Sequence, residues 1–203
     1  MPKDNFFKLD QEKRDRIINA AYDEFITYKS NYKKASIKRI VKEADISIGS
    51  FYEYFDDKDD LFLFLINNIA DKKQKYVFNE KDNIKDIFLK ILKISEDNSI
   101  LDDREKELLD VLSSNDNDDL IKKFYFDYAL ANFMELNLNR LKRDMNKGLL
   151  NESIDIEFAS YLLTTAEYNI IKYWYYKGIT DNTERLEIAH KFINMIFKGI
   201  YKQ

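Results

Sequence analysis

The chain has 203 residues, of which 45% are hydrophobic, with one proline, four glycines and no cysteine. This length allows one or two domains with a sizeable core, and so few turn-forming residues favour long helices over a many-stranded sheet. The lack of cysteine excludes disulfides and thiolate metal sites, and a formal net charge of -4 excludes a uniformly basic surface. We therefore expect an all-α protein.

The sequence also limits where the chain works. No apolar run reaches membrane-spanning length, and residues 1–16 lack the apolar core of a secretion signal. A chain without cysteine fits the cytosol. We expect a cytoplasmic location and no membrane partner.

The N-terminal part is predicted to hold a short arm and one long helix. Residues 1–9 are expected to form a frayed arm, although Phe6 and Phe7 offer apolar side chains for docking. Residues 10–28 are predicted to form a helix whose apolar residues face the elements that follow: Ile17, Ile18, Ala21 and Phe25. Residues 29–35 are expected to form a basic loop.

Residues 36–55 are predicted to form two short helices joined by a tight turn. Ser36 is expected to cap the first helix and Ser47 the second, which runs over residues 48–55. The turn falls at Asp45, a residue type that tolerates the left-handed conformation. Helices this short must pack on neighbouring helices, through Ile40, Val41, Ile46, Phe51 and Phe55. This pattern describes a helix-turn-helix.

Positive charge gathers around this motif. Between Tyr28 and Tyr54 the chain carries six lysine and arginine residues and three acidic ones, in a chain whose total charge is negative. An ordinary solvated face is the alternative interpretation of such a cluster. Beside a helix-turn-helix, the cluster predicts contacts with nucleic-acid phosphates.

The stretch over residues 36–62 resembles the DNA-binding signature of the TetR family of transcriptional regulators; it reads SIKRIVKEADISIGSFYEYFDDKDDLF. The match includes the aromatic end of the second helix and a lysine beyond it: Tyr52, Tyr54, Phe55 and Lys58. With the preceding IINAAYDEF, the resemblance covers residues 10 to about 66. Two positions depart from the family pattern: Asp45 stands where glycine is usual, and Ile48 where a polar or basic residue is common.

The resemblance implies that the second helix lies in the DNA major groove. It assigns DNA contacts to eight residues: Ser36, Lys38, Ile48, Gly49, Ser50, Tyr52, Tyr54 and Lys58. Residues 48, 49, 50 and 52 fall where base edges are approached, residue 38 reaches a base or a phosphate, and residues 36, 54 and 58 fall where phosphates are held. An exposed Ile48 would contact a thymine methyl group; inward packing of Ile48 is the alternative.

The rest of the chain is predicted to be a helical body. A helix from residue 58 to about Phe78 connects it to the motif and carries the apolar stripe Leu61, Leu65, Ile69 and Ala70. Further helices are predicted around residues 84–92, which include Leu92, and over residues 105–112, after Asp102 or Asp103. A longer one is predicted over residues 118–146, after a loop at residues 113–117.

The last two predicted helices, residues 156–176 and 183–201, each have two apolar faces. The short loop between them contains Gly178 and Asp181, so the helices form an antiparallel pair. One face of this pair needs a partner, and the resemblance implies a homodimer through the last two helices, whose twofold symmetry matches a palindromic operator. A fully buried hairpin in a monomer is the alternative.

Aromatic residues make up 15% of the chain. Many lie on the body helices: Phe124, Tyr125, Phe126, Tyr128, Phe133, Tyr161, Tyr168, Tyr173, Trp174 and Tyr175. They suit a pocket for a largely apolar, planar or cationic effector, with Glu135 and Glu167 as acids for a cation. Core and dimer packing is the alternative, so no pocket residue is assigned.

Little in the sequence indicates an enzyme. The single histidine, His190, lacks the spacing of a catalytic pair or a metal site, and no glycine-rich phosphate loop occurs. We therefore predict no catalysis, no cofactor and no metal. The expected protein has a DNA-binding domain at residues 1–56 and a regulatory and dimerisation domain at residues 57–203. We expect it to bind double-stranded DNA and to regulate transcription in response to a small molecule. The family resemblance implies repression. A helical protein-binding adaptor that no longer reads DNA is the alternative.

Overall fold

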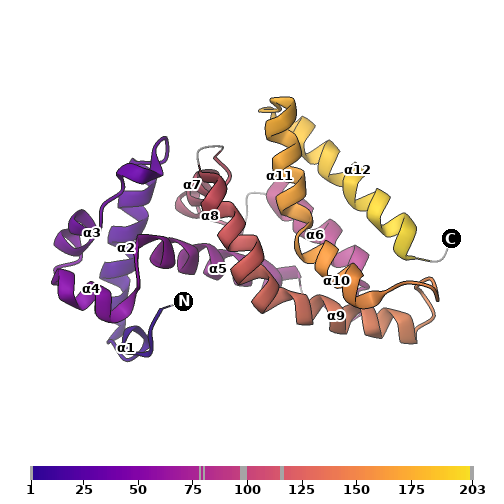
Figure 1. Cartoon of the computed structure of the whole chain (residues 1–203), viewed down its shortest axis with the longest axis horizontal. Helices are drawn as coiled ribbons and strands as arrows, with labels where there is room; N and C mark the ends of the chain where they lie inside the picture. The colour runs from indigo at the N-terminus through magenta and orange to yellow at the C-terminus, as the bar shows by residue number, and fades with distance from the viewer. Residues whose placement is uncertain (1, 78, 80, 97–99, 115–116, 202–203) are drawn as a thin grey trace. The chain divides into compact units, whose positions relative to one another are not determined.

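A computed structural model describes residues 2–77, 79, 81–96, 100–114 and 117–201, with the backbone alone at residues 92–96. All regular elements among them are helical, which confirms the predicted all-α class, and one isolated bridge pairs Leu150 with Tyr201 (Figure 1). No helix in these ranges has both the length and the apolarity to cross a bilayer.

The chain forms two compact units. The first unit comprises Met1–Lys72 and Leu101–Leu120, and the second comprises Lys73–Ile100 and Ile121–Gln203. Helix α5 runs from the first unit into the second, and α8 spans the division between residues 120 and 121.

The first unit is built around α2. Its helices are α1 (Asp4–Phe7), α2 (Gln11–Thr27), α3 (Ile37–Glu43), α4 (Ile48–Tyr54), the start of α5 (Lys58–Val77) and α7 (Asp103–Leu112), with the 3-10 turn η1 (Tyr32–Lys34). Helix α2 packs on α3 and α7, and α4 packs on α1 and α3. The core is rich in aromatic rings that are fully buried: Phe6, Phe25, Phe51, Phe55 and Phe62. These contacts hold the two short helices of the motif, as the sequence predicts.

The second unit contains the remaining helices. They are α6 (Ile84–Glu96), α8 (Asp118–Lys123), the π-helical segment η3 (Phe124–Ala129), α9 (Leu130–Asn146), α10 (Ile156–Thr164), α11 (Ala166–Lys177) and α12 (Asn182–Ile200). Helix α9 packs on α10 and α6, and α12 packs on α6 and α11. Their shared core is aliphatic apart from one ring: Ile84, Leu141, Leu150, Ala159, Leu163, Ile170, Ala189, Ile193, Phe197 and Ile200.

Local capping explains where several helices begin. Aspartate carboxylates at Asp10, Asp102, Asp155 and Asp181 each accept a hydrogen bond from a backbone N–H of the first turn, which satisfies donors that have no partner within the helix. Asp102 and Glu105 form a reciprocal capping box. At the other end of α11, Gly178 has a φ of 66° and ends the helix. The predicted glycine stop and aspartate restart are confirmed.

Two predicted helices differ from the structure in detail. The helix over residues 118–146 is continuous but changes to π geometry in η3. The helix predicted over residues 156–176 is interrupted at Thr165, where ψ is 4°. Thr164 and Thr165 donate their hydroxyl protons to the backbone carbonyls of residues 160 and 161, and such side-chain bonds compete with the helix ladder and bend it. The predicted helix end at Phe78, the side chain of Leu92 and the loop positions 115 and 116 lie outside the described residues.

The N-terminal arm is folded, so the expectation of a frayed arm is wrong. Residues 4–7 form α1, and Phe6 is only 1% exposed. Its ring lies 4.9 Å from that of Phe55 and 5.5 Å from that of Phe64, centroid to centroid. Phe7, by contrast, stays half-exposed. Burial of this ring, together with the hydrogen bond from the N–H of Lys3 to the carbonyl of Tyr54, holds the segment in place.

Candidate nucleic-acid interface

The turn between α3 and α4 is closed by backbone hydrogen bonds. The N–H of Ile46 donates to the carbonyl of Val41 at 3.0 Å, and that of Asp45 donates to the carbonyl of Lys42 at 3.4 Å. This is the Schellman pattern, which requires a left-handed residue after the helix. Asp45 supplies it with a φ of 53°, so the predicted replacement of glycine by aspartate is confirmed.

The start of α4 is capped as predicted. Ser47 Oγ accepts a hydrogen bond from the N–H of Ser50 at 3.0 Å and lies 2.9 Å from Ser50 Oγ. Both hydroxyls are therefore engaged with each other at the first turn of α4. Ser50, predicted to approach base edges, is only half-exposed.

The start of α3 is held differently from the prediction. Ser36 occupies the N-cap position, but its side chain accepts no capping hydrogen bond. Instead its N–H donates to Glu24 Oε1 at 2.7 Å, and Arg39 Nη2 donates to the same oxygen at 2.7 Å. Glu24 is buried, and its hydrogen bond raises the pKa of the Arg39 guanidinium. Glu24 therefore fixes α3 onto α2, a role that no local pattern indicated because the partners are distant in sequence.

The folded N-terminal arm holds the C-terminal end of α4 through hydrogen bonds. Lys3 Nζ donates to the carbonyl of Tyr52 at 2.9 Å and lies 2.7 Å from the Asp56 carboxylate. The N–H of Lys3 donates to the carbonyl of Tyr54 at 2.8 Å. A lysine at a helix C-terminus satisfies carbonyls that have no partner in the helix and opposes the helix dipole. The sequence prediction missed this contact, and the paired phenylalanines were the only signal of it.

Four of the eight predicted DNA-contacting residues lie on the surface. Lys38 and Gly49 are exposed, Ile48 is 43% exposed and Tyr52 is 50% exposed. Ile48 and Tyr52 are four residues apart and so share one face of α4. The exposure of Ile48 argues against the inward packing that the sequence left open. A Cβ at Gly49 would meet only Ser47 Oγ, at 3.6 Å, so the protein's own packing does not require glycine there.

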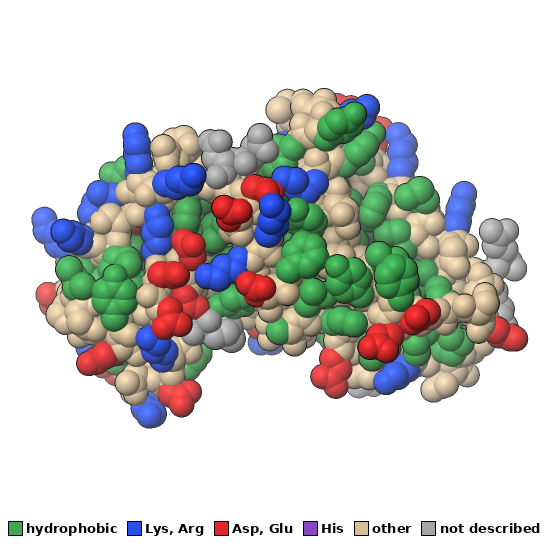
Figure 2. All heavy atoms as spheres, in the orientation of Figure 1, with side chains coloured by type: hydrophobic (Ala, Val, Ile, Leu, Met, Phe, Trp, Pro, Cys, Tyr) green, Lys and Arg blue, Asp and Glu red, His purple; other side chains and the backbone are tan. Residues whose placement is uncertain are grey.

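Basic side chains accompany this face. Figure 2 shows lysine and arginine side chains gathered at the left-hand end of the view, over the region where Figure 1 draws α3 and α4. Lys33, Lys34, Lys38 and Lys42 are all exposed. A positive rim beside an exposed helix face is the arrangement that DNA phosphates favour.

Two predicted phosphate contacts lie inside the unit instead. The ring of Tyr54 is buried between α1 and α2 residues, with its centroid 6.3 Å from that of Phe6 and 5.8 Å from Lys13 Nζ. Lys58 Nζ donates to the carbonyls of Tyr32, Lys33 and Ala35 at 3.0, 3.2 and 3.0 Å. Those three bonds use all the ammonium protons, and burial lowers the pKa of Lys58. Phosphate contact by Tyr54 and Lys58 stays a prediction, and it requires both side chains to leave these positions.

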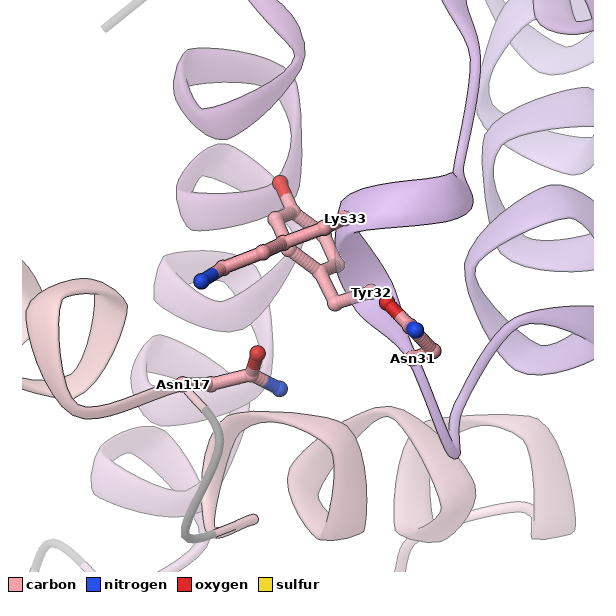
Figure 3. A pocket seen from close by; sticks show the side chains of 4 residues that line it. All are labelled: Asn31, Tyr32, Lys33 and Asn117. Carbon is pink, nitrogen blue, oxygen red and sulfur yellow. The ribbon is translucent and has the colours of Figure 1, made fainter.

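A small pocket lies beside η1. It has a volume of about 280 Å³ and is lined by Asn31, Tyr32, Lys33 and Asn117. Figure 3 shows the Lys33 side chain extending from η1 toward the side lined by Asn117. Tyr32 Oη donates to Asp59 and Asn117 Nδ2 donates to the carbonyl of Val111, each within 2.8 Å. Two of the four lining side chains are thus engaged in internal hydrogen bonds, and a lining this polar does not suit an apolar effector.

The N-terminal part of the chain matches one known protein family. The description "Bacterial regulatory proteins, tetR family" belongs to a family model that matches residues 17–65, from α2 into α5. Over this N-terminal region the chain matches the TetR family. The match covers the helix-turn-helix and its supporting helices, so the family resemblance predicted from residues 36–62 is confirmed.

Two curated relatives extend the comparison. HbdR, an HTH-type transcriptional regulator of Aromatoleum sp. (strain CIB), is 36% identical over 70 residues, which is 34% of this chain and 30% of HbdR. An uncharacterized HTH-type transcriptional regulator of Lactococcus lactis subsp. lactis is 31% identical over 136 residues, or 67% of this chain and 60% of the relative. The matched region thus spans less than two thirds of either relative.

Two solved structures share the fold over nearly the whole chain. GusR of Salmonella enterica superposes with a TM-score of 0.61 at 18% identity, covering 95% of this chain and 98% of GusR. SmeT, the repressor of the Stenotrophomonas maltophilia multidrug efflux pump SmeDEF, gives 0.62 at 14% identity, covering 98% and 93%. At such identities the likeness establishes the fold alone.

Proposed function

We propose that the chain is a transcriptional regulator that binds a palindromic operator as a homodimer and responds to a small-molecule effector. The observation that carries this proposal is the exposed face of α4, where Ile48 and Tyr52 project from a helix held by Lys3 at one end and Ser47 at the other. The family match and the two HTH-type relatives support it. We propose repression because SmeT is a repressor.

We propose that the two domains predicted from the sequence have separate functions. Residues 1–56 bind DNA, and residues 57–203 hold the effector and the dimer interface. SmeT forms a complex with triclosan, which supports an effector site in the body of this chain. A regulator of a bacterial family works where the chromosome lies, so we also propose a cytoplasmic location.

Alanine substitutions at Lys38 and Tyr52 are expected to weaken operator binding roughly ten- to a hundredfold each, because both side chains are exposed beside the face that enters the major groove. DNA sites are first selected from a random duplex pool, and affinity is then measured by gel shift at several salt concentrations. If Lys38 contacts a phosphate, Lys38→Ala also lowers the salt slope by about one.

The matched controls carry the same substitutions away from the proposed interface. Tyr76→Ala on α5 and Lys142→Ala on α9 remove exposed side chains and are expected to leave affinity unchanged. Equal losses in all four variants would contradict the assigned face. A protein that selects no sequence, and whose binding is only competitor-sensitive, would favour the adaptor alternative.

The dimer interface is proposed on α11 and α12, the last two helices. Tyr173, Tyr176 and Met195 expose 45%, 80% and 64% of their surface, and exposed apolar side chains of this size are candidates for an interaction surface. In Figure 2, hydrophobic side chains are visible over the part of the second unit that contains α9 to α11. Twofold pairing of these helices covers them.

Met195→Glu is expected to shift the protein from dimer to monomer, because twofold symmetry places two unpaired carboxylates in one apolar interface. Sedimentation equilibrium measures the mass of the protein in solution, which is compared with the chain mass of 24.4 kDa. Tyr76→Glu, on an exposed site of α5, is the control and should remain dimeric. A wild-type protein that sediments as a monomer at micromolar concentration would contradict the proposed interface.

A further inference from the structure

Arg140, on α9 in the second unit, is a buried cation without an acidic partner. The residue is only 4% exposed. Its Nη1 donates to Asn137 Oδ1 at 3.4 Å and its Nη2 donates to Gln74 Oε1 at 3.2 Å. Both acceptors are neutral amides, and Nε has no hydrogen-bond partner. Among the residues that the structure describes, no carboxylate pairs with this guanidinium.

A buried cation without an acidic partner lowers the stability of the fold. Buried charges in proteins are normally paired, because burial removes their hydration. Here the charged neighbour that acts on the group is Arg143, which has the same sign; burial and this repulsion together lower the pKa of Arg140 to about 10. The two hydrogen bonds from Arg140 to the side-chain amide oxygens are also long compared with charge-assisted hydrogen bonds, which measure about 2.7–2.9 Å. Gln74 and Asn137 therefore act as weak partners that a stronger acceptor can replace.

Arg143, one turn further along α9, differs from Arg140 because it lies beside an acid. Its Nη2 donates to the backbone carbonyl of Asp82, and its Nε lies 3.6 Å from Asp144 Oδ1. Asp144 in turn accepts hydrogen bonds from the N–H of Ile84 and from Tyr201 Oη. The positive charge of Arg143 is therefore balanced, whereas that of Arg140 is not.

The surroundings of Arg140 are polar and ordered. Asn137 Nδ2 donates to Thr164 Oγ1 at 3.0 Å, while Thr164 donates its own proton to the carbonyl of Ser160 at 2.7 Å. Thr164 can then only accept from Asn137, which directs the Asn137 oxygen toward Arg140. Residues 137, 160 and 164 are all buried. A buried polar network from α9 and α10 thus holds one side of the guanidinium and leaves its Nε without a hydrogen-bond acceptor.

We propose that Arg140 receives the oxyanion of the effector, a carboxylate or phosphate group, through Nε and an Nη in a bidentate pair. The proposal rests on the effector response proposed above and adds its chemical class. A planar guanidinium fork matches the two oxygens of such a group, and the pair supplies the charge that the site lacks. The incoming oxyanion displaces Gln74, which lies on α5. Because α5 begins directly after the helix-turn-helix, a change at Gln74 acts on the helix that continues into the DNA-binding unit.

The test compares two arginines on the same helix in the full-length protein without DNA. Thermal unfolding is recorded for wild type, Arg140→Met, Arg140→Lys and Arg143→Met. The probes are benzoate, octanoate and inorganic phosphate, with benzamide and octanamide as uncharged analogues and chloride holding the ionic strength constant. The carboxylates and phosphate separate the two sources of an oxyanion.

The unliganded proteins already distinguish the two arginines. Arg140→Met is expected to melt at the wild-type temperature or above it, because it removes an unpaired buried charge, whereas Arg143→Met melts lower. At about a hundredfold excess over its Kd, an oxyanion probe is expected to raise the wild-type Tm by roughly 5–10 °C. The amide analogue should not do so, Arg140→Met should abolish the rise, and Arg140→Lys should reduce it.

Three results overturn the proposal: a rise that persists in Arg140→Met, no rise with any oxyanion, or an unliganded Arg140→Met that melts as low as Arg143→Met. These measurements need no DNA, so failure of the regulator proposal in the gel shift leaves them interpretable. Release of bound DNA by the same probe, lost in Arg140→Met, then connects the site to regulation.

Discussion

Phe6→Ala is expected to destabilise the first unit by roughly 3–5 kcal/mol, the usual cost of truncating a fully buried phenylalanine. The ring is 1% exposed and contacts the rings of Tyr54, Phe55 and Phe64. Its loss leaves a cavity where α1 meets α4 and α5, and this also releases Lys3 from the end of α4. Urea unfolding followed by circular dichroism measures the change.

Phe7 provides a matched control in the adjacent position. Its ring is 50% exposed, so Phe7→Ala is expected to cost less than about 1 kcal/mol. Because the arm positions α4, Phe6→Ala should also weaken operator binding more than Phe7→Ala does at temperatures where both variants are folded. Equal stabilities of the two variants would show that the arm does not dock.

Asp144→Ala is expected to destabilise the second unit by roughly 3 kcal/mol or more. The side chain is fully buried, and its Oδ2 accepts from the N–H of Ile84 at 2.8 Å and from Tyr201 Oη at 2.5 Å. Each hydrogen bond to a charged group contributes about 1.5–3 kcal/mol, and removal of the carboxylate leaves a buried N–H unsatisfied. Burial, together with the bond to Asp144, raises the pKa of Tyr201.

Glu135→Ala, an exposed acid on the same helix, is the control and should change stability by less than about 0.5 kcal/mol. A double-mutant cycle of Asp144→Ala with Tyr201→Phe isolates the pair, and a coupling energy near zero would refute the bond. The same carboxylate joins the start of α6, the end of α9 and the residue after α12, so its loss should loosen all three together.

Much of the site could be predicted from local signals. The helix-turn-helix, its turn at Asp45 and the cap at Ser47 are read from residues three to five positions apart. The exposure of Ile48, which the sequence left open against inward packing, was decided only by the structure. The contacts of Glu24, Lys3 and Lys58 could not be predicted in this way, because each joins residues separated by 12 to 53 positions.

By itself, the sequence determined the helical class, most helix starts and ends, and the family of the DNA-binding motif. Caps, glycine stops and apolar periodicity act within one or two turns, so their energies are present in the local chain before it folds. Only the tertiary structure decided that the arm docks through Phe6 and that Arg140 is buried without an acid. Those outcomes depend on which distant groups meet in a desolvated interior, where an unpaired charge or a cavity carries its full cost.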